Sequence, residues 1–145
     1  MKRKPKNKQK KISQMQTERK DIAYKYKLLV YLMDNIPDAI YFKDKRGKLV
    51  LVNQTHAKGL GMKPEDAIGK TDFDLFTKNA AERMVKDDKR VIKTGKPMID
   101  KIERATRPDG VDNYVSTTKI PLRDEKGNII GLAGITRDIT KRMQF

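Results

Sequence analysis

The sequence predicts an α+β fold, in which helices cover one face of a five-stranded antiparallel sheet and an amphipathic helix precedes it. Three features of the 145 residues support this prediction. Two short runs of β-forming residues come early, several helical segments occupy the middle, and three longer β-type runs separated by turn signals come last. This order is typical of a layered α+β domain.

Composition limits the classes of protein that this chain can be. It contains no cysteine and one histidine, which excludes disulfides, thiolate metal sites and most zinc chemistry, so we expect no metal site. Its longest apolar run, Leu28 to Met33, is far short of the roughly 20 residues that cross a bilayer. The basic N-terminus has no apolar segment behind it and is therefore no signal peptide. We expect a cytoplasmic protein without a membrane span.

Positive charge is concentrated at the N-terminus. Residues 1–20 carry nine Lys or Arg and one Glu, whereas the whole chain carries a net charge of +15. We interpret residues 1–11 as a disordered basic arm. Such an arm suits nucleic acid or an anionic surface, and a nucleic-acid-associated regulator stays open as an alternative. No aromatic residue lies among the first 20 positions to stack on bases, so nucleic acid is not our expected partner.

Residues 12–34 form a predicted amphipathic helix. Apolar residues recur at intervals of three and four, with Arg19 at one position of the series. The members of this seam are Ile12, Met15, Ile22, Tyr26, Leu29 and Met33. The spacing is that of a coiled coil and predicts a homodimer through this helix. The alternative is an amphipathic helix that packs on its own domain.

The next segments alternate between strands and short helices. We expect strands at 39–43 and 48–53, joined by a turn at 44–47. Asn53 caps a predicted helix over 54–60, and helical turns follow at 62–66 and 72–76. A longer amphipathic helix is predicted over 79–93, because apolar residues recur along one face and glycine ends it.

Three predicted strands complete the sheet, at 98–106, 111–123 and from 128 to about 137. The last is apolar on both faces, as a strand in the middle of a covered sheet should be. Gly131 and Gly134 interrupt it, which indicates close approach by another backbone or a ligand. Asp138 or Thr140 then caps a helix, so we expect the domain to span residues 35–140 and a linker helix to begin within 141–145.

Five stretches of this sequence, in this order, resemble a PAS domain followed by its PAC motif. They are Asn35–Asp44, Gly47–Asn53, Ile68–Phe76, Thr118–Gly127 and Gly134–Thr140. The resemblance implies strand order 2-1-5-4-3, a ligand cavity between the sheet and the helices, and a C-terminal linker that passes signals on. It does not fix the ligand, because one fold hosts many functions.

The resemblance and the strand alternation together suggest which side chains face the cavity. The expected ligand-binding residues are Tyr41, Lys43, His56, Phe73, Met84, Val85, Asp88, Val115, Thr117, Lys119 and Thr136. Two inward lysines are costly without partners. The nearest candidate partners are Asp72, Asp74, Asp88 and Glu103. Either these groups form structural ion pairs, or Lys43, Lys119 and His56 hold a small carboxylate or phosphate.

Cofactor chemistry is restricted by the missing cysteine. The flavin-cysteinyl adduct and the thioester chromophore found in some PAS domains both need that residue. Haem needs an axial donor, commonly a histidine on the long helix, whereas His56 lies on a predicted short helix, so we do not expect haem. His56 could contact a ligand or titrate near neutral pH, or it could simply pack on Leu60. The cofactor is left unknown.

We expect a sensor rather than an enzyme, because no nucleophile and base stand in a recognisable context and the Asp72–Asp74 pair is common in charge-rich chains. The predicted function is a PAS module of a two-component system, such as a histidine kinase or a diguanylate cyclase. Asp138, expected to pair with a basic group, and Thr140 would relay the cavity state to a C-terminal output domain beyond this chain. A ligand-free dimerisation module is the alternative.

Overall fold

The computed structural model describes residues 3–106 and 109–143. It divides into two compact units, Met1–Asp34 and Asn35–Phe145, and each is described by itself below. No described helix combines the length and the apolar character that a membrane crossing requires.

The first unit is formed by helix α1, Arg3–Asn35, whose last residue belongs to the second unit. The prediction of a disordered arm over 1–11 was therefore wrong from Arg3 onward, while residues 1–2 lie outside the described chain. Lysine, arginine and glutamine are good helix formers, and a proline in the first turn, Pro5, is tolerated there. The helix thus extends well before the first seam residue, Ile12.

The second unit contains the predicted five-stranded sheet. Its strands are β1 Ala39–Asp44, β2 Leu49–Val52, β3 Met98–Thr106, β4 Asp112–Arg123 and β5 Ile129–Asp138. Their order is β2-β1-β5-β4-β3, and every neighbouring pair is antiparallel. The predicted order is confirmed, and β5, the last strand in the sequence, lies in the middle of the sheet.

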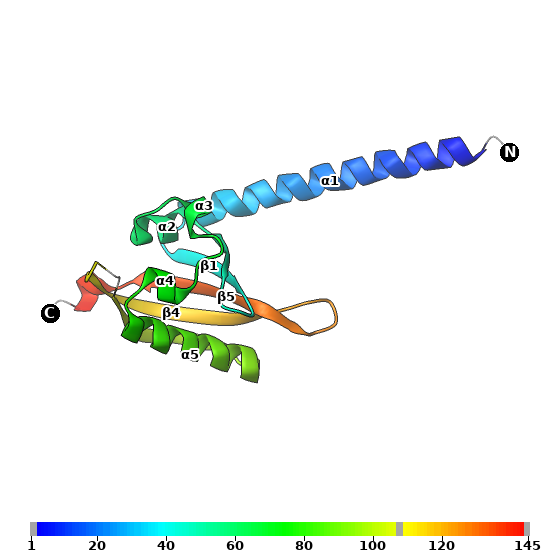
Figure 1. The fold of residues 1–145 in the computed structure, drawn as a ribbon. Helices are drawn as coiled ribbons and strands as arrows, with labels where there is room; N and C mark the ends of the chain where they lie inside the picture. Colours follow the sequence, from blue (N-terminus) through cyan, green and yellow to red (C-terminus); the bar gives the residue numbers. More distant parts are fainter. Residues whose placement is uncertain (1–2, 107–108, 144–145) are drawn as a thin grey trace. The chain divides into compact units, whose positions relative to one another are not determined.

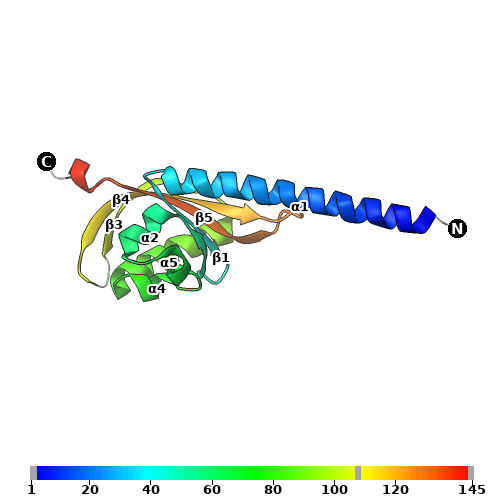
Figure 2. The ribbon, with the colours of Figure 1, turned by 90° about the horizontal axis from the view of Figure 1, so that it is seen from above.

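Helices cover one face of this sheet. They are α2 Gln54–Leu60, α3 Pro64–Ala67, α4 Asp72–Leu75 and α5 Lys78–Thr94, and Figures 1 and 2 show α2, α4 and α5 on the same side of the strands. The Asn53 side chain accepts a hydrogen bond from the backbone of His56 and so caps α2, as predicted. After β5 the chain forms a single 3₁₀ turn, η1 Thr140–Met143, in place of an α-helix.

Two glycines in β5 let the neighbouring strand approach closely. A Cβ atom on Gly131 would lie 2.1 Å from the carbonyl oxygen of Lys43, and one on Gly134 would lie 2.0 Å from the ring of Tyr41. Only glycine leaves this room, so the predicted close approach is confirmed. The Tyr41 ring consequently lies over Gly134 of the middle strand, on the helix-covered face of the sheet.

Candidate functional site

Four buried charged side chains form an ion-pair cluster between the sheet and α5: Lys43, Asp72, Asp88 and Lys119. The Lys43 ammonium lies 2.7 Å from a carboxylate oxygen of Asp72 and 2.7 Å from one of Asp88. Lys119 pairs with the other oxygen of Asp88 and donates to the carbonyl of Met84. Each of the four residues is at most 5% exposed. Two cations and two anions therefore neutralise one another inside the domain.

The cluster keeps Lys43 charged. Burial by itself would lower the pKa of Lys43, but Asp72, Tyr41 and Asp88 outweigh it, and the pKa of Lys43 is raised above its ordinary value. The ammonium also lies 5.1 Å from the centre of the Tyr41 ring. Because both lysines have carboxylate partners, neither offers a free charge to an anionic ligand.

The other two candidate partners of the lysines bond elsewhere. Asp74 accepts hydrogen bonds from the backbone and side chain of Thr71 and so completes a capping box on α4. Glu103 accepts a hydrogen bond of 2.7 Å from the Thr117 hydroxyl. Of the four predicted partners, the structure thus places Asp72 and Asp88 against the lysines.

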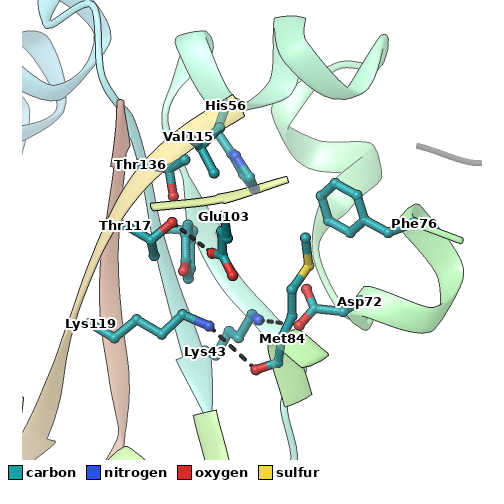
Figure 3. A pocket seen from close by; sticks show the side chains of 11 residues that line it. Lys43, His56, Asp72, Phe76, Met84, Glu103, Val115, Thr117, Lys119 and Thr136 are labelled. Carbon is teal, nitrogen blue, oxygen red and sulfur yellow. Dashed lines mark hydrogen bonds and ion pairs between the residues drawn. The ribbon is translucent and has the colours of Figure 1, made fainter. Parts of the chain in front are cut away.

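A cavity of about 60 Å³ lies beside the cluster. Figure 3 shows its lining: Tyr41, Lys43, His56, Asp72, Phe76, Met84, Glu103, Val115, Thr117, Lys119 and Thr136. Eight of the eleven expected ligand-binding residues are among them. Val85 is half-buried and outside the lining, while Asp88 lies behind the cavity and holds the two lysines.

Phe73 was wrongly placed in the cavity, where Phe76 lies instead. Phe73 is 51% exposed on the outer side of α4. With Thr71 as the N-cap and Asp74 closing the capping box, Asp72 and Leu75 share the buried face of this single turn. The capping box in the sequence Thr71–Asp74 was the signal that could have distinguished the two phenylalanines.

A second cavity, of about 160 Å³, adjoins the first. Both cavities are lined by His56, Phe76, Val115 and Thr136, so these four side chains stand between them. The second cavity also reaches Asp138 at the end of β5. A continuous path of lining residues thus joins the ion-pair cluster to the C-terminal end of the sheet.

The cavities are bordered by polar groups that lack hydrogen-bond partners among the described residues. We call them the open polar groups: the Tyr41 hydroxyl, the His56 ring, the Thr136 hydroxyl and the Glu103 carboxylate oxygen that does not bond Thr117. Tyr41 is only 6% exposed. Since buried polar atoms nearly always have a hydrogen-bond partner, such a group needs water or a ligand.

His56 is neutral at physiological pH. Burial, and to a smaller degree the charge of Lys43, lower the pKa of His56 to about 4, which disfavours the alternative that His56 titrates near neutral pH. Its ring lies 5.2 Å from that of Tyr41, centre to centre. Burial likewise raises the pKa of Tyr41 well above its ordinary value. Both rings therefore act as neutral hydrogen-bonding groups.

The relay residues lie at the rim of the second cavity. Asp138 accepts hydrogen bonds from the backbone of Thr140 at 2.9 Å and from its hydroxyl at 2.6 Å. Within residues 3–106 and 109–143 its partner is thus Thr140 rather than the expected basic group. The neighbouring Arg137 makes two hydrogen bonds, of 3.1 and 3.2 Å, to the carboxylate of Asp38. That pair joins the end of β5 to the entry of β1.

Comparisons with known proteins agree with this architecture. A family model for the PAS fold matches residues 33–144. The methanogenesis regulatory histidine kinase FilI of Methanothrix harundinacea is 28% identical over 129 residues, which are 89% of this chain and 14% of that protein. The chain therefore spans about a seventh of this curated relative.

Solved structures are similar as well. A PAS domain from Colwellia psychrerythraea is 25% identical with a TM-score of 0.69, covering 81% of this chain and 98% of the other. VqmA of Vibrio cholera, in a complex with a ligand and DNA, is 30% identical with a TM-score of 0.68, covering 77% of this chain and 50% of the other.

Proposed function

Because this chain belongs to the PAS family, we propose that residues 35–140 bind a small molecule between the sheet and the helices and signal its presence through the end of β5. The single observation that carries the proposal is the pair of adjoining cavities bordered by open polar groups. A similar protein, VqmA, was solved as a ligand complex, which supports a binding role.

The route of the signal follows from the lining of the second cavity. Thr136 borders both cavities, and Asp138, two residues later on β5, borders the second. Asp138 fixes Thr140, whose hydroxyl accepts a hydrogen bond of 3.0 Å from the backbone of Tyr114 on β4. A ligand that shifts Thr136 therefore moves the hydrogen bonds that hold the first turn after the sheet.

The test is backbone amide chemical-shift mapping of the 145-residue chain with a panel of small metabolites. We expect at least one compound to shift the amides of His56 and Thr136 and, together with them, that of Thr140. In Asp138→Ala the first two shifts persist and the third disappears. A panel that shifts no cavity amide would refute the binding role, and unchanged coupling in the variant would refute the relay.

We further propose that the relay acts on an output domain in a longer signalling protein, by analogy with the histidine kinase FilI, of which this chain matches a small part. The measurement is output activity of the full-length protein with and without Asp138→Ala. Regulation that is identical in both proteins would count against the relay.

Dimerisation through α1 is a second candidate role, favoured by the exposure of its apolar seam. Ile12, Met15, Ile22, Tyr26 and Leu29 are between 47% and 66% exposed. Sedimentation of Ile22→Glu/Leu29→Glu is expected to give a monomer, because charges replace the seam, whereas the control Tyr24→Glu lies off the seam and leaves a dimer. If the double variant is still a dimer, the seam is not the interface.

A further inference from the structure

We propose that the cavity selects small cationic or N–H-donating ligands, such as amines and amidines, and rejects carboxylates and phosphates. The inference rests on the proposed binding function and adds the chemical class of the ligand. It replaces the alternative, left open by the sequence, that Lys43, Lys119 and His56 hold a small carboxylate or phosphate.

The first argument is that buried carboxylates already neutralise the positive charges of the site. Lys43 is paired with Asp72 and Asp88, and Lys119 with Asp88, all at most 5% exposed. An anion that approached either lysine would compete with the buried carboxylates already paired to it and would be repelled by their charge. His56 is neutral and adds no positive charge.

The second argument is that Glu103 brings an unbalanced negative charge to the cavity. It comes from β3, is half-buried and lines the smaller cavity. Its described side-chain partner is a neutral hydroxyl, that of Thr117, and no cationic side chain within the described residues pairs with it. Figure 3 shows its carboxylate pointing into the cavity between Thr117 and Met84. A ligand N–H group, especially a charged one, supplies the missing donor.

The remaining lining residues limit the polarity and the size of the ligand. Tyr41 and Thr136 offer hydroxyls that can donate or accept, and Val115, Met84 and Phe76 form an apolar wall. A water needs about 10–15 Å³ of such space, so a cavity of about 60 Å³ accepts a group of roughly four heavy atoms. A larger ligand extends past His56 into the second cavity.

An isosteric series tests the charge preference directly. Acetamidinium, acetamide and acetate each have four heavy atoms and carry charges of +1, 0 and −1. Titrations of the 145-residue chain are followed by the amide shifts of Glu103, Val115 and Thr136. We expect affinity to fall from acetamidinium to acetamide to acetate, with the cation binding at least about tenfold more tightly than the anion.

The variant Glu103→Gln assigns the preference to this carboxylate. It keeps the size of the side chain and is expected to reduce the ratio between acetamidinium and acetate to within about threefold. The control Glu125→Gln removes the same charge from an exposed turn and leaves the ratio unchanged. A preference that survives Glu103→Gln overturns the role of Glu103.

The remaining outcomes separate this inference from the function beneath it. If acetate binds as well as acetamidinium, or better, the charge selection is refuted while small-molecule binding stands. If none of the three probes shifts a cavity amide, the inference is refuted, and the metabolite panel decides separately whether the cavity binds a ligand.

Discussion

The inner face of the sheet has two ends that handle buried polar groups in opposite ways. At one end, the ion-pair cluster satisfies every charge internally: Lys43, Asp72, Asp88 and Lys119 bond to one another. At the other, the open polar groups border two cavities without described partners. Strand β1 supplies Tyr41 to one end and Lys43 to the other, only two residues apart.

The difference teaches where to look for binding in a polar interior. Polar groups that are fully paired with one another stabilise the structure, because removing one of them leaves the others without a partner. Groups without partners leave hydrogen-bonding capacity that a ligand can use. By this criterion the buried lysines are structural. The groups available to a ligand are the open polar groups of Glu103, His56, Tyr41 and Thr136.

The most severe way to break the ion-pair cluster is Asp88→Asn. It deprives both lysines of a shared carboxylate, so we expect the free energy of unfolding to fall by about 3–5 kcal/mol, measured by chemical denaturation. The control Asp87→Asn, one residue earlier, removes a partly exposed pair with Lys101, whose side chains are 13% and 43% exposed respectively, and is expected to cost clearly less, about 1 kcal/mol. Equal losses of stability would mean that the buried cluster contributes no more than the Asp87–Lys101 pair.

At the end with the open polar groups, the histidine makes stability depend on pH. Its pKa of about 4 in the folded chain is below the ordinary 6.5, so the unfolded state binds the extra proton between these values. We therefore expect the contribution of His56 to be fully present above pH 6.5 and stability to fall by at most about 3 kcal/mol as the pH drops to 4.

The comparison that isolates this contribution is wild type against His56→Gln, unfolded at several pH values. Hydrogen bonds from backbone amides lower the pKa values of Asp74 and Asp124 too, but their contribution is lost below their ordinary value of 3.8 and is common to both chains. Parallel stability curves between pH 4 and 6.5 would show that His56 is as accessible to protons folded as unfolded.

The boundary between the two ends is tested by Gly134→Ala. The new methyl group would meet the Tyr41 ring, so the ring must move, and we expect a loss of about 1–3 kcal/mol. Gly59→Ala is the control, because a Cβ there meets nothing within 4 Å and alanine favours a helix by about 0.5–1 kcal/mol. Thermal unfolding that ranks both variants alike would contradict the close approach.

The smallest expected effect comes from comparing two threonines on the inner face of the sheet. Thr117→Val removes the hydrogen bond to Glu103 and is expected to cost about 1–2 kcal/mol. Thr136→Val removes a hydroxyl with no partner among the described residues and is expected to stay within about 0.5 kcal/mol of wild type. Denaturation curves in the reverse order would show that an unseen group already satisfies Thr136.

Much of this architecture was predictable because its signals are local. Strand alternation placed Lys43 inward, and the family resemblance did the same for Lys119. The two β5 glycines indicated a close approach that the structure confirms. The strand order came from the family resemblance and is confirmed. The start of α1 could not be predicted from composition alone, because a lysine-rich segment can be disordered or can extend a helix.

The details of the site were less predictable, because they depend on which groups meet across the fold. The sequence indicated four carboxylates as candidate partners of the two lysines, but it did not indicate that Glu103 would bond Thr117 instead. The exchange of Phe73 for Phe76 arose because a single helical turn has no periodicity to read. The depressed pKa of His56 depends on burial, which no spacing reveals.

The position of β5 also has a consequence for biosynthesis. The strand pairs Ala39 with Thr136 and Asp44 with Gly131, positions that leave the ribosome far apart in time. Until β5 emerges, β1–β2 and β3–β4 have no strand that joins them, and each pair alone is at best marginally stable. The nascent chain can therefore complete its sheet only after β5 has been synthesised, and β5 is also the segment that leads out of the domain.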